Sequence, residues 1–227
     1  MEKKKENPLY SLLFNIVVPV LILTKLSKPE LLGPLYGLLI ALLFPLGYGI
    51  FDFIRVKTIN FISLLGLVSV LLTGVFSLFE LDPFWIAVKE AAVPLVIGIV
   101  IAGSAFIKEP LIKKLLLNEQ FFRRDFVYEN LASKNMVAVF EDYLKRSSIW
   151  LALSFLLSSV LNFGLARYLL TAQPGTVEYN EQIGTMTALS FPVIALPCTI
   201  LMLFILWHIF KTIKTMTGLE FEELMNH

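Results

Sequence analysis

Four polar side chains stand within apolar stretches of the sequence, and their types make them the first candidates for function. Lys89 and Glu90 are adjacent, five or six residues into one apolar stretch, while Asn15 and Asn162 lie in two others. Polar and ionisable groups are costly at membrane depth, so each is a functional candidate by default. We therefore predict a candidate intramembrane polar site made of Asn15, Lys89, Glu90 and Asn162.

A purely structural interpretation competes with this one. Neighbouring residues on a helix point about 100° apart, so Lys89 and Glu90 are not expected to pair with each other, and at least one needs a partner on another helix or water. Lys89 could equally extend its stem toward the headgroups, with Glu90 at the interface. Asn162 must hydrogen-bond to another helix, and such bonds, worth about 0.6 to 2 kcal/mol, more often fix packing than bind substrate.

Other charged or ligating residues suggest less chemistry. Asp52 and Arg55, three residues apart at the end of an apolar stretch, are predicted to form an interfacial charge pair. His208 has no second histidine nearby, which argues against a metal site. The sequence contains no phosphate loop, dinucleotide fingerprint, paired-histidine metal helix or serine-nucleophile elbow. We therefore expect no cofactor, no metal and no enzymatic activity.

The elements that carry these residues follow from composition. The chain has 227 residues, of which 57% are hydrophobic and only 16% are charged, whereas a soluble domain carries roughly 25% charged residues. These values exclude a soluble enzyme, a disordered chain and a collagen-like repeat. The single cysteine, Cys198, excludes a disulfide-built secreted domain. The net charge of +1 gives no argument for a nucleic-acid partner.

Six apolar segments are long enough to cross a bilayer, whose core of about 30 Å takes roughly 17 to 25 apolar residues per helix. We predict an all-α, polytopic membrane helix bundle that forms a single membrane domain over residues 1–227. The first segment is the shortest and contains Asn15, so whether it crosses fully stays open. The predicted spans are 9–24, 31–54, 61–79, 84–107, 149–170 and 187–213.

The basic residues predict the orientation of this bundle. Counted over alternate connections, fifteen of the nineteen Lys and Arg residues fall on one side, and two, Lys25 and Lys28, fall on the other. Short positively charged loops stay in the cytoplasm. Both termini are therefore predicted to be cytoplasmic, which agrees with an even number of spans.

Residues 108–148, between the fourth and fifth spans, are predicted to form an amphipathic cytoplasmic insert. Apolar residues between Leu111 and Leu116 recur at helical spacing with Lys113 and Lys114 on the other side, which is typical of a helix on the bilayer surface. Pro110 suits its start. A second apolar pattern, from Met136 to Ser147, predicts a helix that leads into the fifth span.

Aromatic and basic residues alternate in the middle of this insert, a pattern that could stack nucleic-acid bases. Between two spans, and among six acidic residues of the insert, an interfacial anchor is favoured over nucleic-acid binding. We predict a lipid-facing basic surface made of Lys108, Lys113, Lys114, Arg123 and Arg124.

Prolines interrupt the predicted spans, and two of them bear on the polar site. Each proline frees the carbonyl four residues earlier, which is that of Asn15 for Pro19 and that of Glu90 for Pro94. The surrounding residues, 17–22 and 92–97, are alike and begin the two halves of the chain, as in inverted-repeat transporters. Chance similarity is favoured, because the match covers six residues of common types.

Several short segments of the sequence occur in an order that is similar to that of other proteins. They are Phe14-Asn15-Ile16-Val17-Val18-Pro19, the basic joint from Asp52 to Lys57, Lys89, Pro110-Leu111-Ile112-Lys113-Lys114-Leu115-Leu116, Trp150, Asn162 and Gly184-Thr185-Met186-Thr187-Ala188-Leu189. In this order the chain resembles the intracellular septation protein A family, and more closely an uncharacterised proteobacterial inner-membrane family related to it. The insert around residues 118–140 departs from septation protein A. The resemblance implies a bacterial inner-membrane protein connected with envelope synthesis or division, without established catalysis.

Two functions stay open on this basis. The first is a non-enzymatic inner-membrane protein that acts in cell-envelope maintenance or septation through helix and lipid contacts, with membrane lipids and envelope or division proteins as partners. The alternative is a small secondary transporter or lipid-handling protein with the polar site between two three-helix halves. Because six spans are few, the alternative predicts a homo-oligomer.

Overall fold

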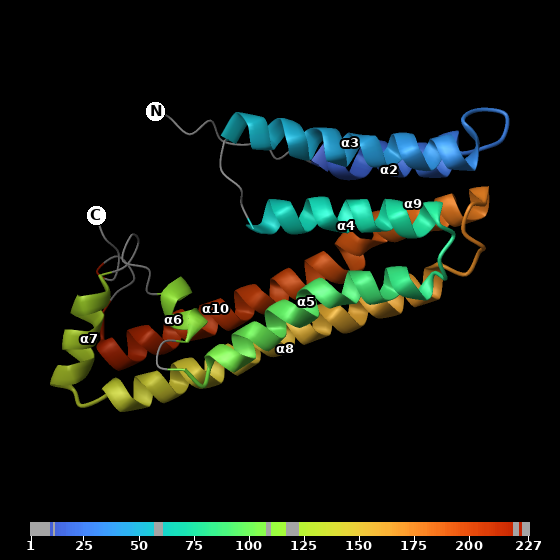
Figure 1. Cartoon of the computed structure of the whole chain (residues 1–227). Coiled ribbons are helices and arrows are strands. Elements are labelled where there is room, and N and C mark those ends of the chain that lie inside the picture. Colours follow the sequence, from blue (N-terminus) through green and yellow to red (C-terminus); the bar gives the residue numbers. More distant parts are fainter. Residues whose placement is uncertain are drawn as a thin grey trace. The chain divides into compact units, whose positions relative to one another are not determined.

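The protein is described from a computed structural model that covers residues 10, 12–56, 61–107, 110–116, 123–219 and 223 (Figure 1). The side chains of residues 52, 53, 55, 56, 61–67, 115 and 116 lie outside this description. Within the described ranges every regular element is a helix, and four helices are long and apolar enough to cross a membrane. An all-α protein with several membrane-length helices is therefore confirmed for this part of the chain.

The four long helices match predicted spans. They are α3 (Gly33–Val56), α5 (Phe84–Ser104), α8 (Val137–Leu169) and the continuous helix made of α9 (Val177–Ser190), the π-helical turn η3 (Phe191–Ala195) and α10 (Leu196–Thr217). Many of their exposed side chains are large and apolar. Exposed apolar surface on this scale is expected where lipid, and not water, surrounds the helices.

Two further apolar helical segments are shorter. The first consists of the π-helical turn η1 (Leu13–Val17), α2 (Val18–Leu21) and the π-helical turn η2 (Ile22–Leu26). At 1.5 Å per residue this segment is about 20 Å long, less than the hydrocarbon core of about 30 Å. The second is α4 (Phe61–Leu78), whose apolar stretch with described side chains is Val68–Leu78.

Prolines and a capping threonine explain the local irregularities. The turn η1 directly precedes α2 with Pro19, and η3 contains Pro192; a proline removes a helix hydrogen bond and favours such wider turns. The last long helix begins at Val177, ten residues before the predicted 187. Its start is fixed by Thr176, whose Oγ1 accepts a hydrogen bond from the Tyr179 backbone N–H at 3.2 Å.

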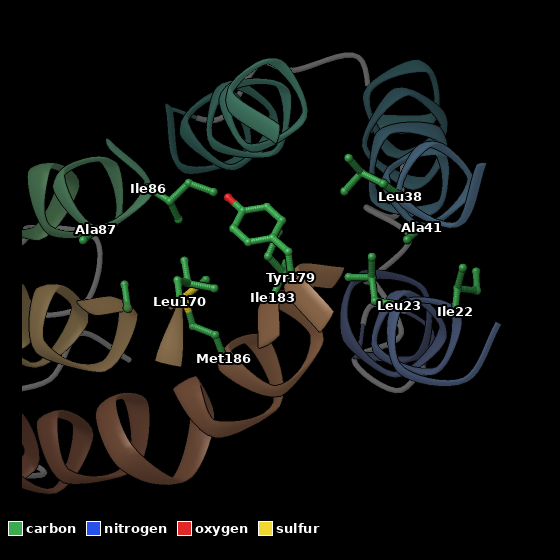
Figure 2. Packing of buried hydrophobic residues seen from close by; sticks show 11 residues of the cluster. Ile22, Leu23, Leu38, Ala41, Ile86, Ala87, Leu170, Tyr179, Ile183 and Met186 are labelled. Atoms are coloured by element: carbon green, nitrogen blue, oxygen red, sulfur yellow. The ribbon is translucent and has the colours of Figure 1, made fainter. Parts of the chain in front are cut away.

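The chain forms two compact units, and each draws on both predicted halves. The first unit comprises Met1–Val93 and Ser159–Ala195. Its core surrounds Tyr179, which is fully buried; Figure 2 shows the ring among apolar side chains from several helices. The buried residues around it include Ile22, Leu23, Leu38, Ala41, Ile86, Ala87, Leu170, Ile183 and Met186.

The second unit comprises Pro94–Ser158 and Leu196–His227, and it contains the predicted insert. Here α6 (Leu111–Leu116) and α7 (Arg124–Ser133) pack against α8 and α10. The buried residues of this core include Ile101, Ile112, Val127, Leu131, Phe140, Leu144, Ile209 and Ile213. The helix predicted to lead into the fifth span is confirmed, because α8 runs without a break from Val137 with Phe140 and Leu144 fully buried.

One side of α6, which the sequence predicts to lie on the bilayer surface, packs inside the protein. Its apolar residue Ile112 is 1% exposed and belongs to a protein core, so this side of α6 does not face lipid. The next helix, α7, is joined to α10, since Lys134 at its C-terminal end donates a hydrogen bond to the backbone oxygen of Thr217 at the end of α10. A lysine near the last carbonyls of a helix also opposes the negative end of its dipole.

Candidate functional site

Lys89 is the centre of a polar cluster between α4 and α5. Its side chain is only 6% exposed. The Nζ atom donates to Ser69 Oγ at 2.9 Å and Ser69 O at 3.3 Å on α4, and to Glu90 Oε1 at 2.6 Å. A lysine ammonium has three N–H donors, so three acceptors are in place for three donors. The cluster links α4 to α5 inside the first unit.

This geometry tests two expectations about Lys89 and Glu90. The expectation that Lys89 and Glu90 would not pair is wrong, because the long flexible stem of lysine lets the charged ends meet although the Cβ atoms diverge. The expectation of a partner on another helix is confirmed by Ser69. Glu90 retains 28% exposure of its side chain, so the cluster is closed on the lysine side and more open at the carboxylate.

The two predicted asparagines lie in the same unit as this cluster. Asn15 belongs to η1 and Asn162 to α8; both are half-buried, and both interact with neighbouring groups. In this unit α8 is joined to α5 through Ser159, whose buried Oγ donates to the Ala91 backbone oxygen at 2.8 Å. The bond lies three residues before Pro94.

Sequence reasoning missed a second buried polar group, Asn180 on α9. It is 1% exposed, and its Nδ2 donates to Pro34 O at 2.7 Å and to Ser27 Oγ at 3.3 Å. These bonds connect α9 to the start of α3 and the end of η2. The capping Thr176 and the apolar spacing of Tyr179, Ile183 and Met186 are the signals that could have predicted this amphipathic helix.

A third polar cluster lies in the second unit, within the insert. Lys113 Nζ donates to Glu141 Oε1 at 2.7 Å and lies 4.8 Å from the centre of the Tyr128 ring. The Tyr128 hydroxyl donates to the same Glu141 oxygen at 2.5 Å. The lipid-facing role predicted for Lys113 is corrected by these contacts, because its side chain is 10% exposed and its charge is neutralised inside the protein.

The environment of Glu141 lowers the pKa of its carboxyl group. Glu141 belongs to the charged first turns of α8, before the apolar stretch that begins at Ile149. Burial by itself raises this pKa. The hydrogen bonds from Lys113 and Tyr128, together with the positive charges of Lys113 and Lys145, lower it by more, so the pKa of Glu141 lies below the ordinary 4.5. The folded chain therefore favours the ionised form of the Glu141 carboxylate.

The other predicted basic residues have diverse surroundings. Lys114 is exposed on α6, and Arg124 is half-buried at the start of α7. Arg123 is exposed, with its guanidinium carbon 4.4 Å from the centre of the Phe126 ring. Lys108 lies outside the described residues, as do the side chains of Asp52 and Arg55, so the predicted interfacial charge pair stays a prediction.

Taken chemically, the clusters described above hold charges in place and join helices. No protein-family model, curated protein or solved structure matches the chain. The resemblance to the septation protein A family therefore stays a prediction that depends on the short segments quoted for it.

Proposed function

We propose that this chain is a non-enzymatic protein of the bacterial inner membrane that acts in cell-envelope maintenance or septation through helix and lipid contacts. The observation that carries the proposal is the saturation of Lys89. All three donors of this buried ammonium have acceptors on Ser69 and Glu90. A substrate would have to break those bonds, and a buried charge left without them is costly. The cluster is thus better suited to joining helices than to binding a solute.

The exposed surface of the long helices supports the same proposal. Leu43 and Ile50 on α3, Ile99 on α5 and Val160 on α8 are each more than half exposed, as are Ile200 and other residues of α10. Large apolar surfaces of this kind are where lipids and other helices dock. We therefore infer that contacts along these faces, with lipid, envelope proteins, division proteins or a second copy, constitute the activity.

Within this proposal six helical segments cross the membrane, and both termini lie in the cytoplasm. The helical segment Leu13–Leu26 and α4 complete the set begun by the four long helices. Reporters fused after Lys28, Leu81, Glu129 and Val177 test this topology. The first two and the last should report the outer side, and Glu129 should report the cytoplasm. A reporter at Glu129 that reads outside would overturn it.

The proposed role of Lys89 is tested by removing both charges of its ion pair. The double variant Lys89→Met/Glu90→Gln should still accumulate in the membrane and restore normal cell length and envelope integrity to a strain that lacks the protein. Replacing both partners of a buried ion pair by uncharged groups is often close to neutral for stability. Glu90→Gln alone, in which the amide oxygen can still accept from lysine, is the matched control.

The exposure of Glu90 keeps a transporter or lipid-handling protein as the second candidate. A carboxylate that is 28% exposed beside a buried lysine is a polar group that a solute can reach. In proteoliposomes this alternative predicts solute flux or proton coupling that is lost in Lys89→Met and in Glu90→Gln. Flux of that kind, together with failure of the folded double variant in cells, would refute the non-transport proposal.

A further inference from the structure

The exposed face of α10 changes character along its length. Ile200, Leu203 and Phe204 are 60%, 57% and 60% exposed, and Trp207 follows at 56%. One turn later comes Lys211, whose Nζ lies 5.2 Å from the centre of the Trp207 ring. The spacing places these residues on one face of the helix. This face therefore passes from aliphatic residues through tryptophan to a cation.

The exposed face of α8 shows the same order when it is followed from the opposite direction. Val160, Leu157 and Leu153 are 60%, 40% and 46% exposed, and Trp150 is 64% exposed. One turn before Trp150 is Arg146, which is exposed and makes only a surface ion pair with Asp142 at 2.8 Å. A pair this exposed is weak, so the guanidinium can exchange Asp142 for another anion.

The structure brings the basic ends of these two faces together within the second unit. The Tyr143 hydroxyl donates to the backbone oxygen of His208 at 3.3 Å, and the two rings lie 6.2 Å apart. Tyr143 is three residues from Arg146, and His208 is three residues from Lys211. The two cations are thus on adjoining ends of α8 and α10, which run beside each other toward α7 (Figure 1).

We propose that this surface, made of Arg146, Trp150, Trp207 and Lys211, binds the phosphate groups of anionic phospholipids. Tryptophan prefers the depth of the headgroups, and basic residues just beyond it attract an anionic leaflet. The inference rests on the proposed membrane arrangement of the helices and names the lipid contact within it. The sequence predicts a headgroup contact for Lys113, but Lys113 is buried in the insert. The inference assigns that contact to residues of α8 and α10.

The balance of charge on these helix ends favours an anionic lipid over a zwitterionic one. Lys145 and Lys214 are exposed on the same two ends, next to Arg146 and Lys211. Of the acids described on this end of α8, Glu141 is already paired with Lys113, and Asp142 makes the exposed pair with Arg146. On the described first turns of α8 and last turns of α10, four basic residues therefore accompany two acidic ones. A basic residue near the surface favours anionic lipid by about 1 kcal/mol, or about fivefold.

Tryptophan quenching tests the inference on the full chain in vesicles. The variant with Trp85→Phe and Trp150→Phe retains only Trp207 and is reconstituted with brominated phosphatidylcholine, which quenches nearby tryptophan. Unbrominated phosphatidylglycerol should displace the quencher at least about fivefold better than unbrominated phosphatidylcholine, since each basic residue near the surface contributes about that factor. The preference should fall about fivefold in Lys211→Gln and stay unchanged in Lys25→Gln, a matched loss of an exposed lysine near the opposite predicted end of the bundle.

The possible results separate this inference from the membrane arrangement on which it rests. A second variant, which retains only Trp85 near the start of α5, should be quenched without preference for either lipid. If Trp207 is quenched but shows no anionic preference, or keeps the full preference in Lys211→Gln, the headgroup surface is refuted while the membrane arrangement stands. If neither tryptophan is quenched, the membrane arrangement itself fails. A variant that retains only Trp150, measured with and without Arg146→Gln, applies the same test to α8.

Discussion

Replacing Lys113 by methionine is predicted to loosen the insert and to leave lipid binding unchanged. Methionine keeps most of the apolar stem but removes the ammonium that bonds Glu141 at 2.7 Å. The prediction separates two roles for the same lysine, since a headgroup-facing lysine would change lipid affinity and not stability. The neighbouring substitution Lys114→Met is the matched control, because Lys114 lies on the same helix and is exposed.

The size of the effect follows from what Glu141 loses and what it keeps. Removing one partner of a fully buried ion pair costs about 3 to 5 kcal/mol, and a hydrogen bond to a charged group is worth about 1.5 to 3 kcal/mol. Glu141 is 27% exposed and retains the bond from Tyr128, so solvent and the phenol compensate part of the loss. We expect about 2 kcal/mol of local destabilisation, which is less than for a fully buried pair and within the range for a hydrogen bond to a charged group.

Hydrogen exchange read by mass spectrometry is the suitable measurement, because unfolding of the whole chain would mix both units. Peptides within residues 123–144, which contain α7 and the start of α8, should exchange about thirtyfold faster in Lys113→Met. Peptides of α3 should not change. The double variant Lys113→Met/Glu141→Gln should recover much of the protection, because it removes the carboxylate left without its cation.

Two outcomes would refute the reasoning. Unchanged exchange in Lys113→Met, relative to the unaltered chain, would mean that the ion pair contributes nothing to holding the insert. Loss of anionic-lipid preference in Lys113→Met with unchanged exchange would restore the lipid-facing role that the sequence suggests.

Three further predictions concern single sites. Acidification should loosen the insert, because the pKa of Glu141 is lower in the folded chain than its ordinary 4.5. The stabilisation that the ionised Glu141 provides is complete above about pH 4.5 and is lost as the pH falls through the folded pKa. Hydrogen exchange of the insert should therefore depend less on pH in Glu141→Gln. Gly37→Ala should destabilise the chain by about 1 to 3 kcal/mol in thermal unfolding in detergent, because its Cβ would lie 2.2 Å from Ser27 Oγ, whereas Gly47→Ala, with open space, should not. Tyr179→Phe should stay within about 1 kcal/mol of wild type in the same assay, because the buried hydroxyl makes no hydrogen bond of normal geometry to any described residue; a loss above about 2 kcal/mol would contradict this.

The positions of the long helices could be predicted because apolar length is a strong and local signal. The expected spans 31–54 and 84–107 differ from α3 and α5 by no more than three residues at either end. The start of α9 was missed for the opposite reason. Residues 177–186 include Glu178, Asn180 and Glu181, so hydropathy alone assigns them to a connection. Packing of Tyr179 and Asn180 inside the first unit makes them part of the helix.

The candidate site was predictable in its residue types and less so in its contacts. Rarity alone identified Lys89 and Glu90, because few ionisable residues occur within the apolar stretches. Their pairing depends on how a flexible stem bends, and the partner Ser69 is twenty residues away on another helix. Neither feature follows from spacing on one helix. Asn180 escaped notice because its partners, Pro34 and Ser27, are about 150 residues earlier in the chain.

Lys113 and Lys211 show why a basic amphipathic pattern does not by itself identify a lipid-facing surface. Each lysine lies on a helix whose apolar residues recur at three- and four-residue spacing, so the sequence pattern treats them alike. What separates them is the burial of the apolar neighbours. Ile112 beside Lys113 is 1% exposed, whereas Trp207, one turn from Lys211, is 56% exposed. Because an ammonium follows its stem, the first lysine points into protein and meets a carboxylate, and the second lies beside the exposed Trp207 ring. The distinction lies in tertiary packing, and a helix that is amphipathic in sequence becomes a membrane-surface helix only when no other part of the chain covers its apolar side.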